Sequence, residues 1–98
     1  MTLAVYLRPD AEKDILEAAI WYEEQRIGLG NQFLNETLAV FSSIAETPLQ
    51  YLLVYRNTRR VLIHRFPFGI YYRITKNRIV VLAVMHGSRN PQRWKKRL

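Results

Sequence analysis

The chain has 98 residues, the length of one small domain, so we expect a single domain over residues 1–98. It is 49% hydrophobic and 23% charged, a globular composition that excludes an intrinsically disordered chain. It contains no cysteine, which excludes disulfide bonds and thiolate metal sites and predicts a reducing, cytoplasmic location. The N-terminus lacks the pattern of a signal peptide, and no run of about 18 apolar residues predicts a membrane-spanning helix.

The net charge of +7 is unevenly distributed along the chain. Residues 1–50 contain all eight acidic residues, whereas residues 51–98 contain no acid and twelve of the 15 basic residues. This asymmetry favours a polyanion or an acidic protein segment as the partner of the second half. The alternative is that the positive charge only keeps the protein soluble.

The first half of the chain predicts a strand followed by two helices. The β-branched and aromatic residues at 2–8 are typical of a strand. Apolar residues recur at helical spacing over 9–26 and again over 31–46, and the Gly-Leu-Gly sequence at 28–30 separates the two helices. The apolar stripe of the first helix consists of Ala11, Ile15, Ala18, Ala19 and Tyr22. The stripe of the second consists of Phe33 or Leu34, Leu38, Phe41, Ile44 and Ala45.

The second half predicts three strands and a short C-terminal element. Runs at 59–66, 68–75 and 78–86 have the length of strands, and the short connection at 75–77 predicts a hairpin between the last two. Residues 78–86 are apolar on both faces, so we expect this strand in the interior of the sheet. The order β-α-α-β-β-β, followed by a helix or turn, predicts an α+β fold with the helical hairpin packed on one face of the sheet.

The other face of the sheet is expected to be open and basic. Alternation places Tyr71 and Arg73 on one face of the strand at 68–75, opposite Tyr72. One set of the basic residues in 59–66 would lie beside them. Such a surface can hold an anionic partner, and the alternative is an ordinary solvated sheet face.

His86 is the main candidate for proton transfer. The only histidines, His64 and His86, lie far apart in the sequence and every acid is in the first half, so we expect neither a metal site nor a cofactor. His86 ends the last strand just before Gly87, near Arg89, where it could act as general acid or base in metal-independent RNA cleavage. The alternative is a structural histidine that is hydrogen-bonded to the turn it precedes.

Trp94 lies within the basic C-terminal tail and has two possible roles. An exposed tryptophan could stack on a nucleic-acid base. Alternatively, it anchors the tail on the core, because aromatic side chains usually pack.

Three segments, in this order, resemble the ParE/RelE superfamily, the toxins of type II toxin–antitoxin (plasmid stabilisation) modules. They are AEKDILEAAIWYEEQRIGLGNQFLNE (11–36), RFPFGIYYRI (65–74) and VLAVMHGSRNPQRWKKR (81–97). The resemblance implies a helical hairpin against a mostly antiparallel sheet. It also implies a cognate antitoxin as partner, which forms a hetero-oligomer with the toxin through a segment that folds on binding.

Two activities occur in the superfamily. ParE-like members poison DNA gyrase without a catalytic site of their own, and Trp-Tyr-Glu at 21–23 and Phe-Pro-Phe at 66–68 are closer to ParE. We therefore expect a gyrase inhibitor. Its expected effector surface comprises Arg89, Arg93, Trp94, Lys95, Lys96 and Arg97.

The alternative is a RelE-like enzyme that cleaves mRNA on the ribosome without a metal. The resemblance then implies that His86 and Tyr72 transfer protons. Arg65, Arg73 and Arg89 would contact the phosphate. A nucleic-acid-binding protein outside these modules, which relies on its charge alone, remains a third possibility.

Overall fold

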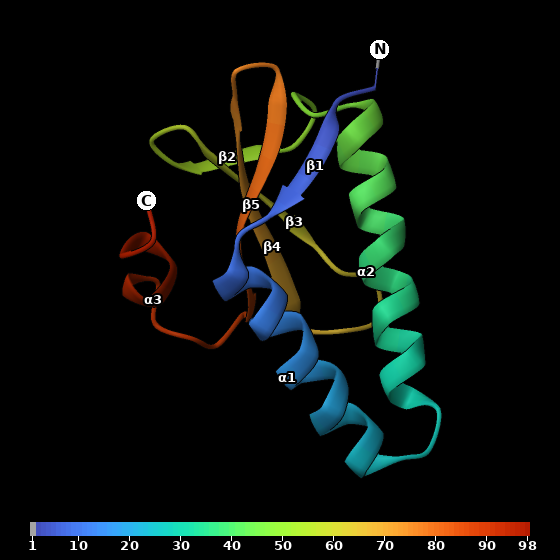
Figure 1. The fold of residues 1–98 in the computed structure, drawn as a ribbon. Helices are drawn as coiled ribbons and strands as arrows, with labels where there is room; N and C mark the ends of the chain where they lie inside the picture. Colours follow the sequence, from blue (N-terminus) through green and yellow to red (C-terminus); the bar gives the residue numbers. More distant parts are fainter. Residues whose placement is uncertain (1) are drawn as a thin grey trace.

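The computed structural model describes residues 2–98. Its elements are β1 (Ala4–Leu7), α1 (Pro9–Gln25), α2 (Leu29–Glu46), β2 (Leu52–Tyr55), β3 (Thr58–Leu62), β4 (Phe68–Thr75), β5 (Arg78–His86) and α3 (Gln92–Lys95). The strands form one sheet in the order β1-β5-β4-β3-β2, in which β1 is parallel to β5 and the other neighbours are antiparallel. The α1–α2 hairpin packs on one face and α3 on the opposite face (Figure 1). The predicted α+β fold is confirmed.

The main core lies between the helical hairpin and the sheet. All five residues of the stripe predicted for α1 are buried, because they recur at the helical period on the side that faces the sheet. In α2 the prediction is wrong at one position. Leu38 is 59% exposed, and Thr37 is buried in its place. Thr37 tolerates burial because its hydroxyl donates to the carbonyl of Phe33 at 2.8 Å.

The corner between α1 and α2 is tight. The carboxylate of Glu23 accepts hydrogen bonds from the main-chain N–H groups of Gly28 and Gly30, at 3.0–3.1 Å. Gly28 has φ +90°, and a Cβ atom at Gly30 would lie 2.6 Å from the carbonyl oxygen of Ala19. The Gly-Leu-Gly sequence therefore serves two needs, a left-handed backbone at Gly28 and close helix contact at Gly30.

Two strand predictions need correction. The strand β2 was not predicted; it lies at the edge of the sheet, where its neighbour is β3. Both Leu52 and Leu53 are exposed there, so the strand shows no inside–outside alternation. The strand predicted at 59–66 ends at Leu62, because the chain turns at Ile63–Pro67 and Arg65 adopts φ 72°. The turn carries Phe66 into the core on the hairpin side.

β5 lies inside the sheet, between β1 and β4, as predicted. Its register with β4 shifts opposite Tyr71 and Tyr72, which pair with Ala83 and Val81, so Leu82 is the extra residue of a bulge. Tyr72 belongs to the core beneath the hairpin, and Tyr71 belongs to the smaller cluster on the other face. The main-chain N–H of Gly87 donates a hydrogen bond to the carbonyl of Pro67 at 2.7 Å, which holds the end of β5 against the β3–β4 turn.

Candidate functional site

The C-terminal segment, defined here as residues 87–98, packs against the second face of the sheet. Trp94 is only 6% exposed, and its ring centroid lies 4.5 Å from that of Tyr71 in an edge-to-face arrangement. Tyr55 of β2 lies 6.1 Å from the same ring. The ammonium of Lys95 sits 4.4 Å from the centre of the Tyr55 ring, a cation–π contact. Trp94 therefore anchors the segment on the core, the second of the two roles considered for it.

Arg97 binds the C-terminal segment to α1. Its guanidinium donates to both carboxylate oxygens of Asp14, at 2.6 and 3.2 Å, and to the carbonyl of Leu82 at 3.1 Å. The hydrogen bond with Asp14 raises the pKa of Arg97 above its ordinary value, against the opposing effect of burial. Asp14 also accepts from the main-chain N–H of Val84 at 3.0 Å, and Arg8 donates to the carbonyl of Arg97. Of the predicted effector residues, Trp94 and Arg97 thus make internal contacts, whereas Arg89, Arg93 and Lys96 are exposed.

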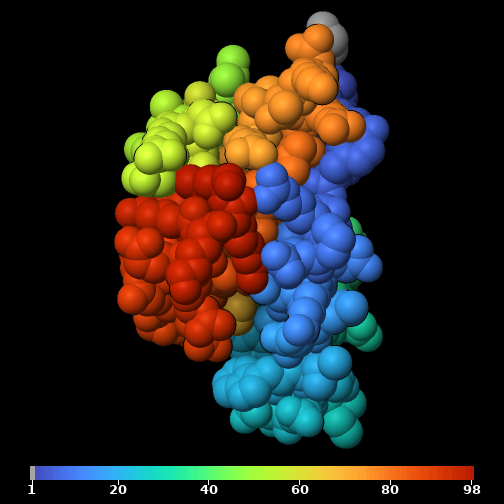
Figure 2. All heavy atoms as spheres, turned by 60° about the vertical axis from the view of Figure 1, so that its left-hand side comes forward, coloured from blue at the N-terminus to red at the C-terminus, as the bar shows by residue number. Residues whose placement is uncertain are grey.

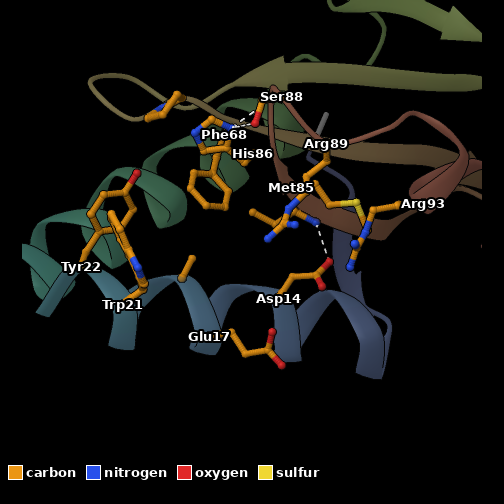
Figure 3. A pocket seen from close by; sticks show the side chains of 13 residues that line it. Asp14, Glu17, Trp21, Tyr22, Phe68, Met85, His86, Ser88, Arg89 and Arg93 are labelled. Atoms are coloured by element: carbon orange, nitrogen blue, oxygen red, sulfur yellow. Dashed lines mark hydrogen bonds between the residues drawn. The ribbon is translucent and has the colours of Figure 1, made fainter. Parts of the chain in front are cut away.

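A pocket of about 630 Å³ lies between α1, the end of β5 and the C-terminal segment. Figure 2 shows the C-terminal segment lying directly beside α1 on this side of the molecule. In Figure 3, Asp14, Glu17, Trp21 and Tyr22 come from α1. His86 is the last residue of β5, and Arg89 and Arg93 come from the C-terminal segment. The fold therefore brings together three of the residues singled out in the sequence, namely His86, Arg89 and Arg93.

His86 is held by the turn that follows it. Its Nδ1 atom accepts a hydrogen bond from the main-chain N–H of Ser88 at 3.0 Å and lies 2.8 Å from the Ser88 hydroxyl. Because a main-chain N–H can only donate, Nδ1 carries no proton here, and the proton of the neutral ring is on Nε2. The ring of Phe68 packs edge-to-face against the imidazole at 5.4 Å. This is the arrangement of a structural histidine bonded to its turn, and it leaves Nε2–H as the ring's donor.

The remaining residues of the RelE-like set do not join this pocket. Tyr72 is fully buried on the hairpin side, where its hydroxyl donates to the carbonyl of Pro48 at 2.6 Å and burial raises its pKa to about 12. A proton-transfer role for Tyr72 therefore does not fit the structure. Arg73 pairs with Val80 across the sheet, and its Nε is buried without a hydrogen-bond partner among residues 2–98. Arg65 lies exposed in the β3–β4 turn.

Glu17, Trp21 and Phe68 also line the pocket, and none of them was predicted as a site residue. A weak signal existed for Trp21, a large aromatic side chain beside, not within, the apolar stripe of its helix. Across residues 2–98, no group of three or more His, Asp or Glu side chains is placed to hold a metal ion. None of the helices in the same range is long and apolar enough to cross a membrane.

Residues 5–91 match the family model described as the ParE toxin of the type II toxin–antitoxin system, parDE. The chain belongs to the ParE toxin family. It is also 30% identical over 95 residues to Toxin ParE2 of Mycobacterium tuberculosis, a match that covers 93% of this chain and 88% of that toxin. The superfamily resemblance seen in the sequence is confirmed, and this ParE-family chain is the toxin component of a type II toxin–antitoxin module.

Two solved structures share the fold of this ParE-family toxin. One is described as the chromosomal ParDE toxin–antitoxin system from P. aeruginosa, with a TM-score of 0.77 and 12% identity over 87% of this chain and 96% of that one. The other is the RelBE2 toxin–antitoxin complex from Mycobacterium tuberculosis, with a TM-score of 0.62 and 17% identity over 88% and 99% of the two chains. At these identities the likeness establishes the architecture and not the activity.

Proposed function

We propose that this ParE-family toxin inhibits DNA gyrase by binding it through the exposed side chains of residues 89–97. The observation that carries the proposal is the way in which this segment is held. Trp94 is buried against β4 and β5, and Arg97 is bound to Asp14. The exposed Lys96 therefore stands on a backbone that is fixed on both sides. Binding to such a preorganised basic surface costs little conformational entropy.

The test combines cells and purified components. On induction of the toxin, DNA synthesis is expected to stop before protein synthesis, and the purified chain is expected to block supercoiling by gyrase. Lys96→Glu should weaken inhibition about tenfold, equivalent to about 1.4 kcal/mol. The matched control is Lys76→Glu, which makes the same charge change at the exposed β4–β5 turn and should leave inhibition intact. Full inhibition by a folded Lys96→Glu protein, or an early arrest of translation, would contradict the proposal.

Metal-independent mRNA cleavage is the second candidate, because His86 lies beside Arg89 and Arg93 in one pocket. Against it, Nδ1 of His86 is occupied by Ser88, and Tyr72 is buried elsewhere. The candidate predicts that translation stops first, that transcripts are cleaved, and that His86→Ala abolishes both effects. The control variant Ser88→Ala removes only the hydroxyl contact with His86. It should retain both the arrest of translation and the cleavage of transcripts.

We further propose a cognate antitoxin as the neutralising partner and the cytoplasm, where gyrase and ribosomes act, as the site of action. The two structural relatives are described as toxin–antitoxin assemblies. The acid-free half of this chain suits an antitoxin segment rich in acidic residues. Co-expression with the protein encoded beside the toxin should restore growth and yield a stable complex whose affinity falls as salt is raised. Restored growth without a complex would argue against direct neutralisation.

A further inference from the structure

The pocket beside α1 has walls of opposite charge. Its volume of about 630 Å³ lies within the range of small-molecule sites, roughly 300–1,000 Å³. Arg89 and Arg93 stand on the side of the C-terminal segment, and Asp14 and Glu17 stand on the side of α1 (Figure 3). A ligand that fills it must present an anionic group at one end and hydrogen-bond donors at the other.

The charges that remain free for a ligand follow from the contacts inside the protein. Asp14 is already occupied by Arg97 and by the N–H of Val84. Within residues 2–98 the charged contact of Glu17 is a loose one, 3.8 Å from Lys13, and its side chain is 66% exposed. Neither Arg89 nor Arg93 has a side-chain hydrogen bond or an ion pair among residues 2–98. The free groups are therefore two guanidinium groups and one carboxylate.

An aromatic surface lies at the end of the pocket away from Arg89 and Arg93, beyond Glu17 along α1 (Figure 3). Trp21 is 55% exposed and stands edge-on to Tyr22, with ring centroids 5.1 Å apart. The two rings are nearly perpendicular, and the exposed part of the indole is available to stack on another flat ring. Phe68 lines the pocket deeper inside, next to His86.

We propose that this pocket binds a purine nucleotide, with the phosphate on Arg89 and Arg93, the base stacked on Trp21, and the N–H groups of the base donated to Glu17. Guanine is favoured, because it presents two adjacent N–H donors to a carboxylate, whereas adenine presents only its amino group. Paired guanidinium groups suit a phosphate. An acidic peptide fits less well, because its further carboxylates would meet Asp14 and Glu17. The proposal does not depend on gyrase as the target.

The first experiment is a titration of the full chain with GMP, followed by NMR of the two indole N–H signals. Trp21 and Trp94 are the only tryptophans, and Trp94 is buried on the other face of the sheet. The Trp21 signal is expected to shift and the Trp94 signal to stay. Guanosine and inorganic phosphate should each bind at least about tenfold more weakly than GMP, since each makes half of the contacts.

Variants separate the parts of the site. Arg89→Gln and Arg93→Gln should each weaken GMP binding about tenfold, and Lys76→Gln, the same charge change at a distant turn, should not. Glu17→Ala should abolish the preference for GMP over AMP. No shift of Trp21 at millimolar GMP, phosphate binding as tight as GMP, or an equal loss in Lys76→Gln would each overturn the assignment.

A last comparison identifies the source of the nucleotide. If a short guanine-containing single strand binds more tightly than GMP and is displaced by it, the natural ligand is an unpaired base of a nucleic acid. If the strand binds no more tightly than GMP, the ligand is a free nucleotide. Either result supports the pocket, and binding of the strand without any shift of Trp21 would contradict it.

Discussion

Asp14 and Arg97 form a two-point ion pair that joins the first helix to the C-terminal segment. The pair lies at the point where β1 has ended and the edge of β5 is uncovered. There, Arg97 donates to the carbonyl of Leu82 and Asp14 accepts from the N–H of Val84, so the two side chains satisfy main-chain groups that a neighbouring strand would otherwise pair with. One ion pair thereby satisfies main-chain groups at the edge of β5 and also holds in place the segment that we propose as the effector surface.

Arg97→Ala should lower the free energy of unfolding by about 2 kcal/mol, because a hydrogen-bonded and largely buried carboxylate loses its partner. Urea denaturation at neutral pH measures the change. Lys13→Ala, which removes the exposed contact with Glu17, is the control and should cost less than about 0.5 kcal/mol. An equal effect of the two substitutions would show that the Arg97 contact adds nothing beyond a surface charge.

Trp94→Ala should release the C-terminal segment while the main core stays folded, because Trp94 belongs to the smaller cluster on the other face. The loss of a buried indole costs about 3 kcal/mol or more, and Trp94→Phe should cost less. Limited trypsin digestion should then cleave at Arg89 or Arg93 much faster than in the parent chain. Unchanged protection of these sites would mean that Arg97 alone holds the segment.

Stability should fall as the pH rises from about 10 to 12, because Tyr72 is buried and its folded pKa is raised to about 12 from the ordinary 10.0. In that window the unfolded chain loses the phenolic proton and the folded chain keeps it. Unfolding is then favoured by up to about 1.4 kcal/mol per pH unit. Tyr22, whose pKa burial also raises, adds to the slope.

Tyr72→Phe is the control for that prediction. It removes the hydrogen bond to Pro48, at a cost of about 1 kcal/mol near neutral pH. It should also remove part of the alkaline slope, so the two stability curves approach each other above about pH 10 and cross before pH 12. Parallel curves over this range would assign the slope to other groups.

Gly30→Ala should destabilise the protein by about 2 kcal/mol, because the new methyl group would overlap the carbonyl oxygen of Ala19. Gly28→Ala should cost about 1 kcal/mol through its left-handed backbone alone, since nothing lies within 4 Å of a Cβ atom there. Thermal unfolding of both variants gives the comparison. A larger effect at Gly28 would show that backbone strain, not helix contact, governs the corner.

Periodicity explains why most of the fold could be predicted and where prediction failed. The stripe of α1 follows the helical period on the side that packs against the sheet, and all of its residues are buried as predicted. Leu38 was expected in the core, but Thr37 is buried and Leu38 is exposed. A threonine whose hydroxyl is hydrogen-bonded to the preceding helical turn can be buried as easily as an apolar side chain. The edge strand β2 is only four residues long and its burial does not alternate, so alternation could not reveal it.

The candidate site was predictable only in part. His86 and Arg89 lie close in the sequence, so their proximity follows from the chain itself. Trp21 and Glu17 approach them from a distant helix, and no spacing rule indicates such a meeting. Tyr72 was placed in a catalytic set by family resemblance, although its alternation with Tyr71 had already put it on the opposite face.

The ion pair between Asp14 and Arg97 also orders events during synthesis of the chain. Its two members are 83 residues apart, so the acid emerges from the ribosome long before its partner is made. The helical hairpin has no need to wait for it, because the contacts between α1 and α2 are local, whereas β1 has to wait for its partner β5. The basic surface is therefore assembled last. A chain cut short before Arg97 leaves Asp14 without its ion-pair partner and lacks the contact that holds the C-terminal segment against α1.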